Sequence, residues 1–444
     1  MKHFRKIHWL PALALASLAT PVLALGTGSV LDGAAGPVTR QVEQSAERLV
    51  ERRMARQVEE RVETVSESFR NPLENLPAEL PVLTKQGEVA FTEVAVEDGG
   101  RAVERQWLLT GTDEEIARLD QPGITLLKRQ ELAGLGLNLV RFRVSPELDS
   151  RQALQAILPK LVDRLDRNHI YSPQADEPPP EPQARSPRWQ SLCSSPVRVG
   201  MVDTSIATGH PSFRQARVVQ SRFLDVDGAK GQLSEPRAHG TAVASLMVGD
   251  LGNDSPARLP SATLFNASVF YDRNRNLSGA TLGHLLEGLN WLSEQDISVL
   301  NISLTGPDNR VLATVIRNLL DRGLVLVAAV GNQGPAAPPL YPAAYPGVVG
   351  VTAVDDSNEL YRWANRGEQV MFAARGVSVP VAAPEGGRVS DSGTSLAAPV
   401  VTAALACRLR EASAEQAIEA LIGTARDLGE PGRDRSFGHG LLDY

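Results

Sequence analysis

The chain has 444 residues, of which 42% are hydrophobic and 22% are charged, with a formal net charge of −7. At about 150 residues per domain, this length predicts roughly three segments rather than one compact unit. The composition is typical of a globular protein and not of a basic nucleic-acid binder, so we expect no nucleic-acid partner.

Residues 1–24 have the pattern of a secretory signal peptide. A basic start leads into an apolar run, and Val22 and Ala24 are placed for cleavage. The alternative is a membrane anchor, but Pro11 and Pro21 interrupt the run, which is short for a hydrocarbon layer of about 30 Å. We therefore expect export, either to a periplasm or to the medium, and no stable membrane span.

The next segment, 25–92, is expected to be charged and largely helical. Between Gln41 and Phe69, apolar residues recur every three, four or seven positions among many Glu and Arg residues. Such a stretch is usually a solvated helix face around a modest apolar stripe, so we assign it no chemistry.

Residues 93–172 predict a small α+β domain. Its expected elements are, in order, a strand at 106–110, a helix at 112–119 opened by a capping box, strands at 124–128 and 139–144, a helix at 150–165 and a strand at 169–171. This β-α-β-β-α-β order is that of ferredoxin-like domains, a fold that hosts many unrelated activities.

A Pro-rich linker at 173–190 separates this domain from a third one at 191–444. The linker favours extended polyproline geometry. Beyond it, apolar strand-like runs alternate with helix-like stretches; the strands are expected at 197–202, 263–270, 297–304, 324–330 and 348–354, and the helices near 239–247, 279–293 and 309–320. The alternation predicts an α/β domain with a doubly wound, mostly parallel sheet.

Three residues of this domain form a candidate Ser-His-Asp set. Asp203 ends the first strand, His239 lies at the start of a helix, and Ser395 lies at the start of another. Serine is a weak nucleophile at neutral pH, so an imidazole must accept its proton and a carboxylate must hold that imidazole. The sequence therefore predicts Ser395 as nucleophile, His239 as general base and Asp203 as its partner.

Asn332 is the fourth candidate. It lies in a Gly-flanked turn after an apolar strand, where a neutral amide beside the backbone N–H of Ser395 would complete an oxyanion hole.

With these residues in view, the chain resembles the subtilisin-like serine proteases, or subtilases, from Val197 to Tyr444. The order Asp, His, Ser is that of subtilisin. The motifs that carry the resemblance are, in chain order, Val-Asp-Thr-Ser-Ile, His-Gly-Thr, Leu-Pro-Ser-Ala, Asn-Ile-Ser-Leu, Val-Gly-Asn-Gln-Gly, Tyr-Pro-Ala-Ala-Tyr-Pro, Gly-Thr-Ser-Leu-Ala-Ala-Pro and Phe-Gly-His-Gly-Leu-Leu-Asp.

This resemblance implies a serine endopeptidase that acts on polypeptides through an acyl-enzyme intermediate and is matured by proteolysis. It implies that the domain at 93–172 is a propeptide that blocks the active site until it is removed. It also assigns substrate binding to two segments; Ser303, Leu304, Thr305 and Gly306 would pair with the substrate backbone, and Ala328, Ala329 and Val330 would line the primary specificity pocket.

Two further features follow from the same resemblance. Because the helix that begins at Ser395 packs near the first strand in that fold, Cys193 and Cys407 could form a disulfide; two buried free thiols are the alternative. Ser205 and Ala242 depart from the family pattern, which has glycine and histidine at these positions, and the loop from Asn332 to Tyr341 is short.

No cofactor is expected for catalysis. Asp225, Asp227 and the pair Asn253–Asp254 could contribute oxygen ligands to calcium, but solvated turns are the alternative and no clear metal motif is present. His284 and His439 lack catalytic neighbours in the sequence and are interpreted as structural.

Two other classes of function are considered. A catalytically silent subtilase used for binding would lack one of the four active-site groups, and none is missing. A serine esterase would carry Gly-x-Ser-x-Gly, but Gly393-Thr-Ser395-Leu-Ala has no second glycine.

Overall fold

The computed structural model describes residues 76–97, 99–173, 189–226, 231–252, 255–274 and 277–444. The expected signal peptide at 1–24, the charged helix expected within 41–69 and most of the expected linker lie outside these residues. Residues 70–444 belong to one compact unit. Within its described part, we call residues 76–173 the N-terminal domain and residues 189–444 the C-terminal domain.

The N-terminal domain is an antiparallel sheet with two short helices. Its elements are β1 (Glu79–Leu83), β2 (Val89–Ala95), β3 (Arg101–Thr110), α2 (Asp113–Ala117), β4 (Ile124–Leu132), β5 (Leu137–Val144), a 3-10 turn (Pro146–Leu148), α3 (Arg151–Ile157) and β6 (Leu165–Pro173). The order from β3 to β6 is the predicted β-α-β-β-α-β order. β3 lies between β5 and β6, and β4 pairs with β5.

The largest differences from the sequence expectation concern the start of this domain and the end of its second helix. β1 and β2 precede the β-α-β-β-α-β unit, so the expected start at residue 93 falls inside β2, and the end of the segment expected to be helical is a β-hairpin instead. The helix expected at 150–165 ends at Ile157. Leu158 precedes Pro159, and a residue before proline is disfavoured in the helical conformation, so the helix stops there.

The C-terminal domain is built on an eight-stranded parallel sheet of order β19-β16-β15-β14-β12-β7-β9-β8. Its strands are β7 (Arg198–Asp203), β8 (Arg217–Arg222), β9 (Thr263–Ser268), β12 (Val299–Ile302), β14 (Val325–Ala329), β15 (Val349–Val354), β16 (Val370–Arg375) and β19 (Leu441–Leu442). Its helices are α4 (Ala238–Val248), α5 (Leu282–Ser293), α6 (Arg310–Asp321), α7 (Thr394–Arg408) and α8 (Ala414–Thr424), with a 3-10 turn at Pro211–Phe213. Outside this sheet, β10 (Tyr271–Asn274) pairs with β11 (Leu277–Thr281), and β17 (Val379–Ala382) pairs with β18 (Arg388–Asp391). Both β11 and β13 (Leu304–Thr305) pair with β6.

The sheet is covered on both faces, as the runs of apolar strand residues predict. Successive strand residues point to opposite faces. Val199 and Met201 pack with α4 and α7, whereas Val202 packs with α5 and α6. Helix α7 is buried along almost its whole length, which explains why its sequence is apolar all round rather than amphipathic. The predicted α/β class is therefore confirmed.

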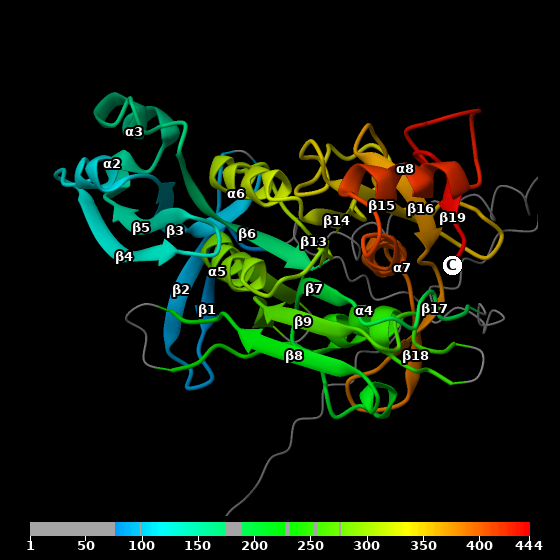
Figure 1. The fold of residues 1–444 in the computed structure, drawn as a ribbon. Coiled ribbons are helices and arrows are strands. Elements are labelled where there is room, and N and C mark those ends of the chain that lie inside the picture. Colours follow the sequence, from blue (N-terminus) through cyan, green and yellow to red (C-terminus); the bar gives the residue numbers. More distant parts are fainter. Residues whose placement is uncertain (1–75, 98, 174–188, 227–230, 253–254, 275–276) are drawn as a thin grey trace, which may run out of the picture. The chain divides into compact units, whose positions relative to one another are not determined.

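The N-terminal domain packs on helices α5 and α6 of the C-terminal domain. Leu108, Leu132 and Leu139 of its sheet share one apolar cluster with these two helices. A second cluster, around Trp107 and Phe142, fills the space between the other face of the sheet and helices α2 and α3. Figure 1 shows β6 running from the N-terminal sheet to β13, so the end of this domain reaches into the C-terminal domain.

Cys193 and Cys407 form a disulfide, with their Cα atoms 5.9 Å apart. It ties the segment before β7 to the last turn of α7. Nearby, the indole of Trp189 donates a hydrogen bond to the carbonyl of Pro256, and the Arg258 guanidinium stacks on its ring. The beginning of the C-terminal domain is thus fixed to the domain by covalent and aromatic contacts. Within the described ranges, no helix has the length and apolar character needed to cross a membrane.

Candidate active site

Asp203 and His239 form a buried hydrogen-bonded pair. Nδ1 of His239 lies 2.7 Å from Oδ1 of Asp203, and both side chains are almost inaccessible to solvent. The same carboxylate oxygen accepts the backbone N–H of Thr204 at 2.6 Å. A carboxylate on Nδ1 places the proton there and leaves Nε2 as the basic nitrogen.

The contact between these two residues depends on a close approach of two backbones. Asp203 ends β7, and His239 lies in the first turn of α4. The N–H of Gly240 donates to Oγ1 of Thr204 at 2.7 Å, and a Cβ at Gly240 would lie 2.3 Å from the Thr204 carbonyl oxygen. Glycine after the histidine is therefore required to bring α4 against the end of β7.

The pKa of His239 is set by opposing effects. Burial disfavours the charged imidazolium, but the charge of Asp203, its hydrogen bond and the charge of Asp391 outweigh burial and raise the pKa of His239 above its ordinary value of about 6.5. The pair is thus suited to accept a proton from a nearby hydroxyl.

Ser395 lies in the first turn of α7 and is buried. A chain of buried hydrogen bonds holds its backbone in place. Thr402 Oγ1 donates to Asn301 Oδ1 at 3.1 Å, Asn301 Nδ2 donates to Ser303 Oγ at 2.9 Å, and Ser303 Oγ donates to the carbonyl oxygen of Ser395 at 3.0 Å. This chain fixes the start of α7 to the end of β12.

The sequence analysis did not identify Asn301 or Thr402, and it assigned Ser303 to substrate binding. The hydroxyl of Ser303 donates a hydrogen bond within the protein, and the pairing of its backbone with a substrate stays a prediction. Asn301 could have been identified from the sequence, because a polar residue within an apolar strand must find a hydrogen-bond partner in the interior.

Asn332 is oriented by its neighbour Thr394. The backbone N–H and the hydroxyl of Thr394 both donate to Oδ1 of Asn332, at 3.1 and 2.9 Å. These two donors fix the orientation of the Asn332 amide beside Thr394, the residue that immediately precedes Ser395. The two residues predicted from separate segments are therefore adjacent in the structure.

The predicted substrate edge is occupied by the tail of the N-terminal domain. Leu304 and Thr305 of β13 pair antiparallel with Pro173 and Ser172 of β6. On its other side, β6 pairs with β11, with Tyr171 opposite Ala280. The tail thus lies as an extended strand between two edges of the C-terminal domain, the geometry of a peptide bound by strand addition.

The other predicted pocket residues, Ala328, Ala329 and Val330, lie at the end of β14 and are fully buried. Ala328 and Val330 face the apolar cluster with α5 and α6. Their role in substrate recognition stays a prediction.

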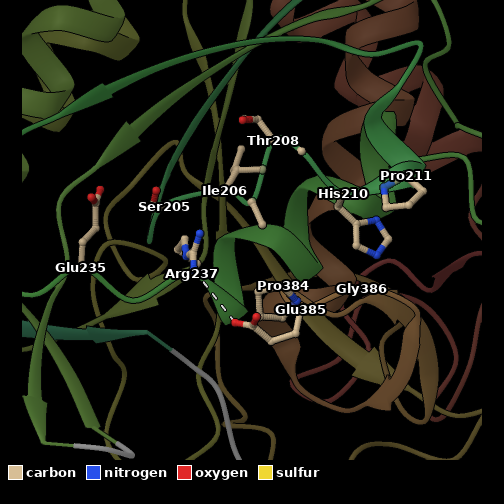
Figure 2. A pocket seen from close by; sticks show the side chains of 12 residues that line it. Ser205, Ile206, Thr208, His210, Pro211, Glu235, Arg237, Pro384, Glu385 and Gly386 are labelled. Carbon is tan, nitrogen blue, oxygen red and sulfur yellow. Dashed lines mark ion pairs between the residues drawn. The ribbon is translucent and has the colours of Figure 1, made fainter.

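A pocket of about 490 Å³ lies beside the Asp203–His239 pair, lined by the loop after Asp203, the segment before His239 and the β17–β18 hairpin. Figure 2 shows Arg237 and Glu385 reaching toward each other across this pocket, 4.0 Å apart. Both side chains are largely exposed, so the ion pair is weak. None of the described residues of the N-terminal domain lines the pocket.

The departures from the family pattern are accommodated locally. Ser205 accepts a hydrogen bond from Gln220 Nε2 at 3.0 Å, and Ala242 packs in the apolar cluster around α4. His284 is buried; burial and the charge of Arg141 lower its pKa to about 3, so it is neutral. It lies against the N-terminal domain rather than in the active site, in line with a structural role.

Within the part of the chain that the structure describes, no three His, Cys, Asp or Glu side chains are grouped to hold a metal ion. Asp227 and Asn253–Asp254 lie outside that part. The structure therefore does not test these residues as calcium ligands, and solvated turns remain the alternative.

Comparison with known proteins agrees with this geometry. Residues 194–440 match the model of the subtilase family. The chain is 33% identical over 280 residues to the minor extracellular protease Epr of Bacillus subtilis, covering 60% of this chain and 40% of that protein. It is 31% identical over 263 residues to subtilisin DY of Bacillus licheniformis, covering 56% of this chain and 89% of that protein.

Among solved structures, fervidolysin from Fervidobacterium pennivorans, a keratinolytic enzyme related to subtilisin, matches with a TM-score of 0.62 and 19% identity. The match covers 83% of this chain and 63% of that one, so the similarity in fold extends beyond residues 194–440 into the N-terminal domain. The chain therefore belongs to the subtilase family, and residues 194–440 are its serine endopeptidase domain.

Proposed function

We propose that this protein is an exported serine endopeptidase, made as a precursor, in which Asp203, His239 and Ser395 form the catalytic triad. The observation that supports this most directly is the buried 2.7 Å hydrogen bond between Asp203 and His239. A buried carboxylate hydrogen-bonded to an imidazole is the arrangement that makes the imidazole a general base. Ser395 at a helix N-terminus and the oriented amide of Asn332 supply the nucleophile and an oxyanion donor.

In the proposed mechanism, Ser395 Oγ attacks the carbonyl carbon of the substrate peptide while His239 Nε2 accepts its proton. The charge on Asp203 stabilises the imidazolium, and the negative oxygen of the tetrahedral intermediate is stabilised by the Asn332 amide and the backbone N–H of Ser395. The imidazolium then protonates the leaving amine, giving an acyl-enzyme at Ser395. Water, activated by the same histidine, hydrolyses this ester and restores the enzyme.

The N-terminal domain is proposed to keep the precursor inactive. Its tail occupies the edges of β11 and β13, where an extended substrate would bind. Tyr171 is fully buried, with its ring against Gly306 and its hydroxyl donating to the Pro307 carbonyl at 3.3 Å. A cut in the chain after Pro173 would release the tail from its covalent link and make inhibition reversible.

The catalytic assignment is tested with Ser395→Ala, which removes the nucleophile with little change in volume. We expect the purified wild-type protein to be labelled by a fluorophosphonate probe and to cleave casein, whereas Ser395→Ala does neither and stays unprocessed. A short-chain ester assayed in parallel separates a protease from an esterase. Casein cleavage by purified Ser395→Ala at the wild-type rate would rule the assignment out.

Export and maturation are tested by N-terminal sequencing of the protein from cell fractions. We expect the protein in the periplasm or the medium, with a new N-terminus between residues 174 and 188. A protein that keeps residues 1–24, or that stays uncut while hydrolysing casein, would contradict this part of the proposal.

A further inference from the structure

A fully buried carboxylate of the N-terminal domain lies in a site formed by the C-terminal domain. Oε1 of Glu93 accepts a hydrogen bond from the hydroxyl of Tyr271 at 2.6 Å and one from Nε of Arg273 at 2.8 Å. The exposed fractions of the Glu93 and Arg273 side chains are 0% and 1%. A buried charge is costly unless it is paired and hydrogen-bonded, so these contacts are specific.

The site is shaped by the β10–β11 hairpin of the C-terminal domain. Tyr271 pairs with Gly279 across the hairpin, and both side chains of the site lie over this glycine. A Cβ at Gly279 would lie 2.7 Å from Nε of Arg273 and 2.9 Å from the hydroxyl of Tyr271. Glycine thus provides the space in which the guanidinium and the phenol converge on one carboxylate oxygen.

This site adjoins the groove in which the tail of the N-terminal domain lies. The next residue of β11, Ala280, pairs with Tyr171 of the tail. Nη1 of Arg273 lies 3.4 Å from Oγ of Ser172, the following tail residue. Arg273 therefore contacts both Glu93 and the side chain of an extended strand bound in the groove.

We infer that Tyr271, Arg273 and Gly279 form a carboxylate-binding subsite of the endopeptidase, and that Glu93 occupies it in the precursor in place of an acidic side chain of the substrate. The inference rests on the proposed function, because the subsite becomes available only when the N-terminal domain leaves. Arg101, which also pairs with Glu93 at 3.3 Å, belongs to the N-terminal domain and leaves with it. Tyr271 and Arg273 remain as donors suited to Asp or Glu at the position of Ser172 in the bound strand.

The test compares two peptides with the sequence of residues 166–183, which differ only in carrying Glu or Gln in place of Ser172. We expect the processed enzyme to hydrolyse the Glu peptide with a kcat/KM about tenfold or more above that of the Gln peptide, because charge-assisted hydrogen bonds contribute more than neutral ones. Mass spectrometry of the products checks that both peptides are cut at the same bond.

Arg273→Gln should bring the ratio of the two kcat/KM values to about one while the Gln peptide is still hydrolysed. Tyr271→Phe, which removes only the hydroxyl, should reduce the ratio by a few-fold and serves if Arg273→Gln does not fold. Arg410→Gln is the matched control, since it makes the same charge change at a surface position and should leave the ratio unaltered.

Equal kcat/KM values for the two peptides in the wild type, or a preference for Glu that persists in Arg273→Gln, would overturn the inference. If the processed wild-type enzyme hydrolyses casein but neither peptide, the subsite inference is overturned while the proposed protease function stands. If it hydrolyses none of the three substrates, the proposed protease function fails.

Discussion

Tyr171→Ala in the N-terminal domain should weaken inhibition of the mature enzyme strongly. The Tyr171 side chain is buried against the C-terminal domain, where its ring lies beside Gly306 and within the apolar cluster of α5 and α6. Truncating a buried aromatic side chain costs about 3–5 kcal/mol. The inhibition constant of the domain should therefore rise by a factor of roughly 10² to 4 × 10³.

The assay adds a fragment of residues 76–173 to the processed enzyme and measures hydrolysis of a fluorogenic peptide. We expect the wild-type fragment to inhibit at micromolar concentration or below, about −8 kcal/mol or better. Tyr171→Phe is the matched control; it keeps the ring and loses only the 3.3 Å hydrogen bond to Pro307, so its inhibition constant should rise less than about tenfold.

The folded state of each fragment is checked by circular dichroism. Because most of the partners of Tyr171 belong to the C-terminal domain, the substitution should affect binding more than folding. A folded Tyr171→Ala fragment that inhibits within threefold of the wild type would refute the idea that the tail is held as a substrate-like strand.

Three further changes test the site and the disulfide. Asn332→Ala should lower kcat by about 10² to 10³ with little change in KM, a magnitude known from subtilisin itself, and a raised KM with intact kcat would make Asn332 a binding residue. Activity requires neutral His239, so kcat/KM should fall as the pH is lowered through the raised pKa of this residue. Asp391→Asn should move this fall in kcat/KM to lower pH, and an unchanged pH profile would exclude the charge of Asp391 as a cause of the raised pKa. Thiol titration of the denatured, unreduced protein should detect neither Cys193 nor Cys407, and two titratable thiols would contradict the disulfide. Reduction should lower the free energy of unfolding by about 5 kcal/mol, because the two cysteines are 214 residues apart.

The sequence was most informative where function depends on short segments at the ends of regular elements. Asp203 was recognisable because it follows the apolar run of a strand, and His239 because it comes just before the apolar run of a helix. Gly240 shows why the motif extends beyond the histidine, since only glycine allows the contact with Thr204. The order of strands and helices was predictable for the same reason, because periodicity is a local property.

Features that depend on partners far away in the chain were not predictable. The helix expected from residue 279 begins at Leu282, since Leu277–Thr281 instead forms β11 and pairs with β6. The pairing of Glu93 with Arg273 joins residues 180 positions apart, and in the sequence each is an ordinary surface charge. Contacts between distant segments determine both the strand at 277–281 and the pairing of Glu93 with Arg273, and a local sequence pattern does not encode such contacts.

The two edges that hold the tail differ in what they can recognise. β13 offers backbone groups and, at Gly306, a bare surface that accepts the Tyr171 ring; a Cβ there would lie 2.3 Å from the ring. The β10–β11 hairpin offers backbone groups and two charged or polar donors over Gly279. Backbone pairing is indifferent to sequence. In addition to the predicted pocket at Ala328–Val330, selectivity among extended segments can therefore come from these two sites, the one at Gly306 for an aromatic ring and the one at Gly279 for a carboxylate. In the precursor, the N-terminal domain fills both sites, the first with its tail on β6 and the second with Glu93 from β2, which is separated from β6 by β3. A single peptide would therefore need a large ring and an acid at adjacent positions to match it.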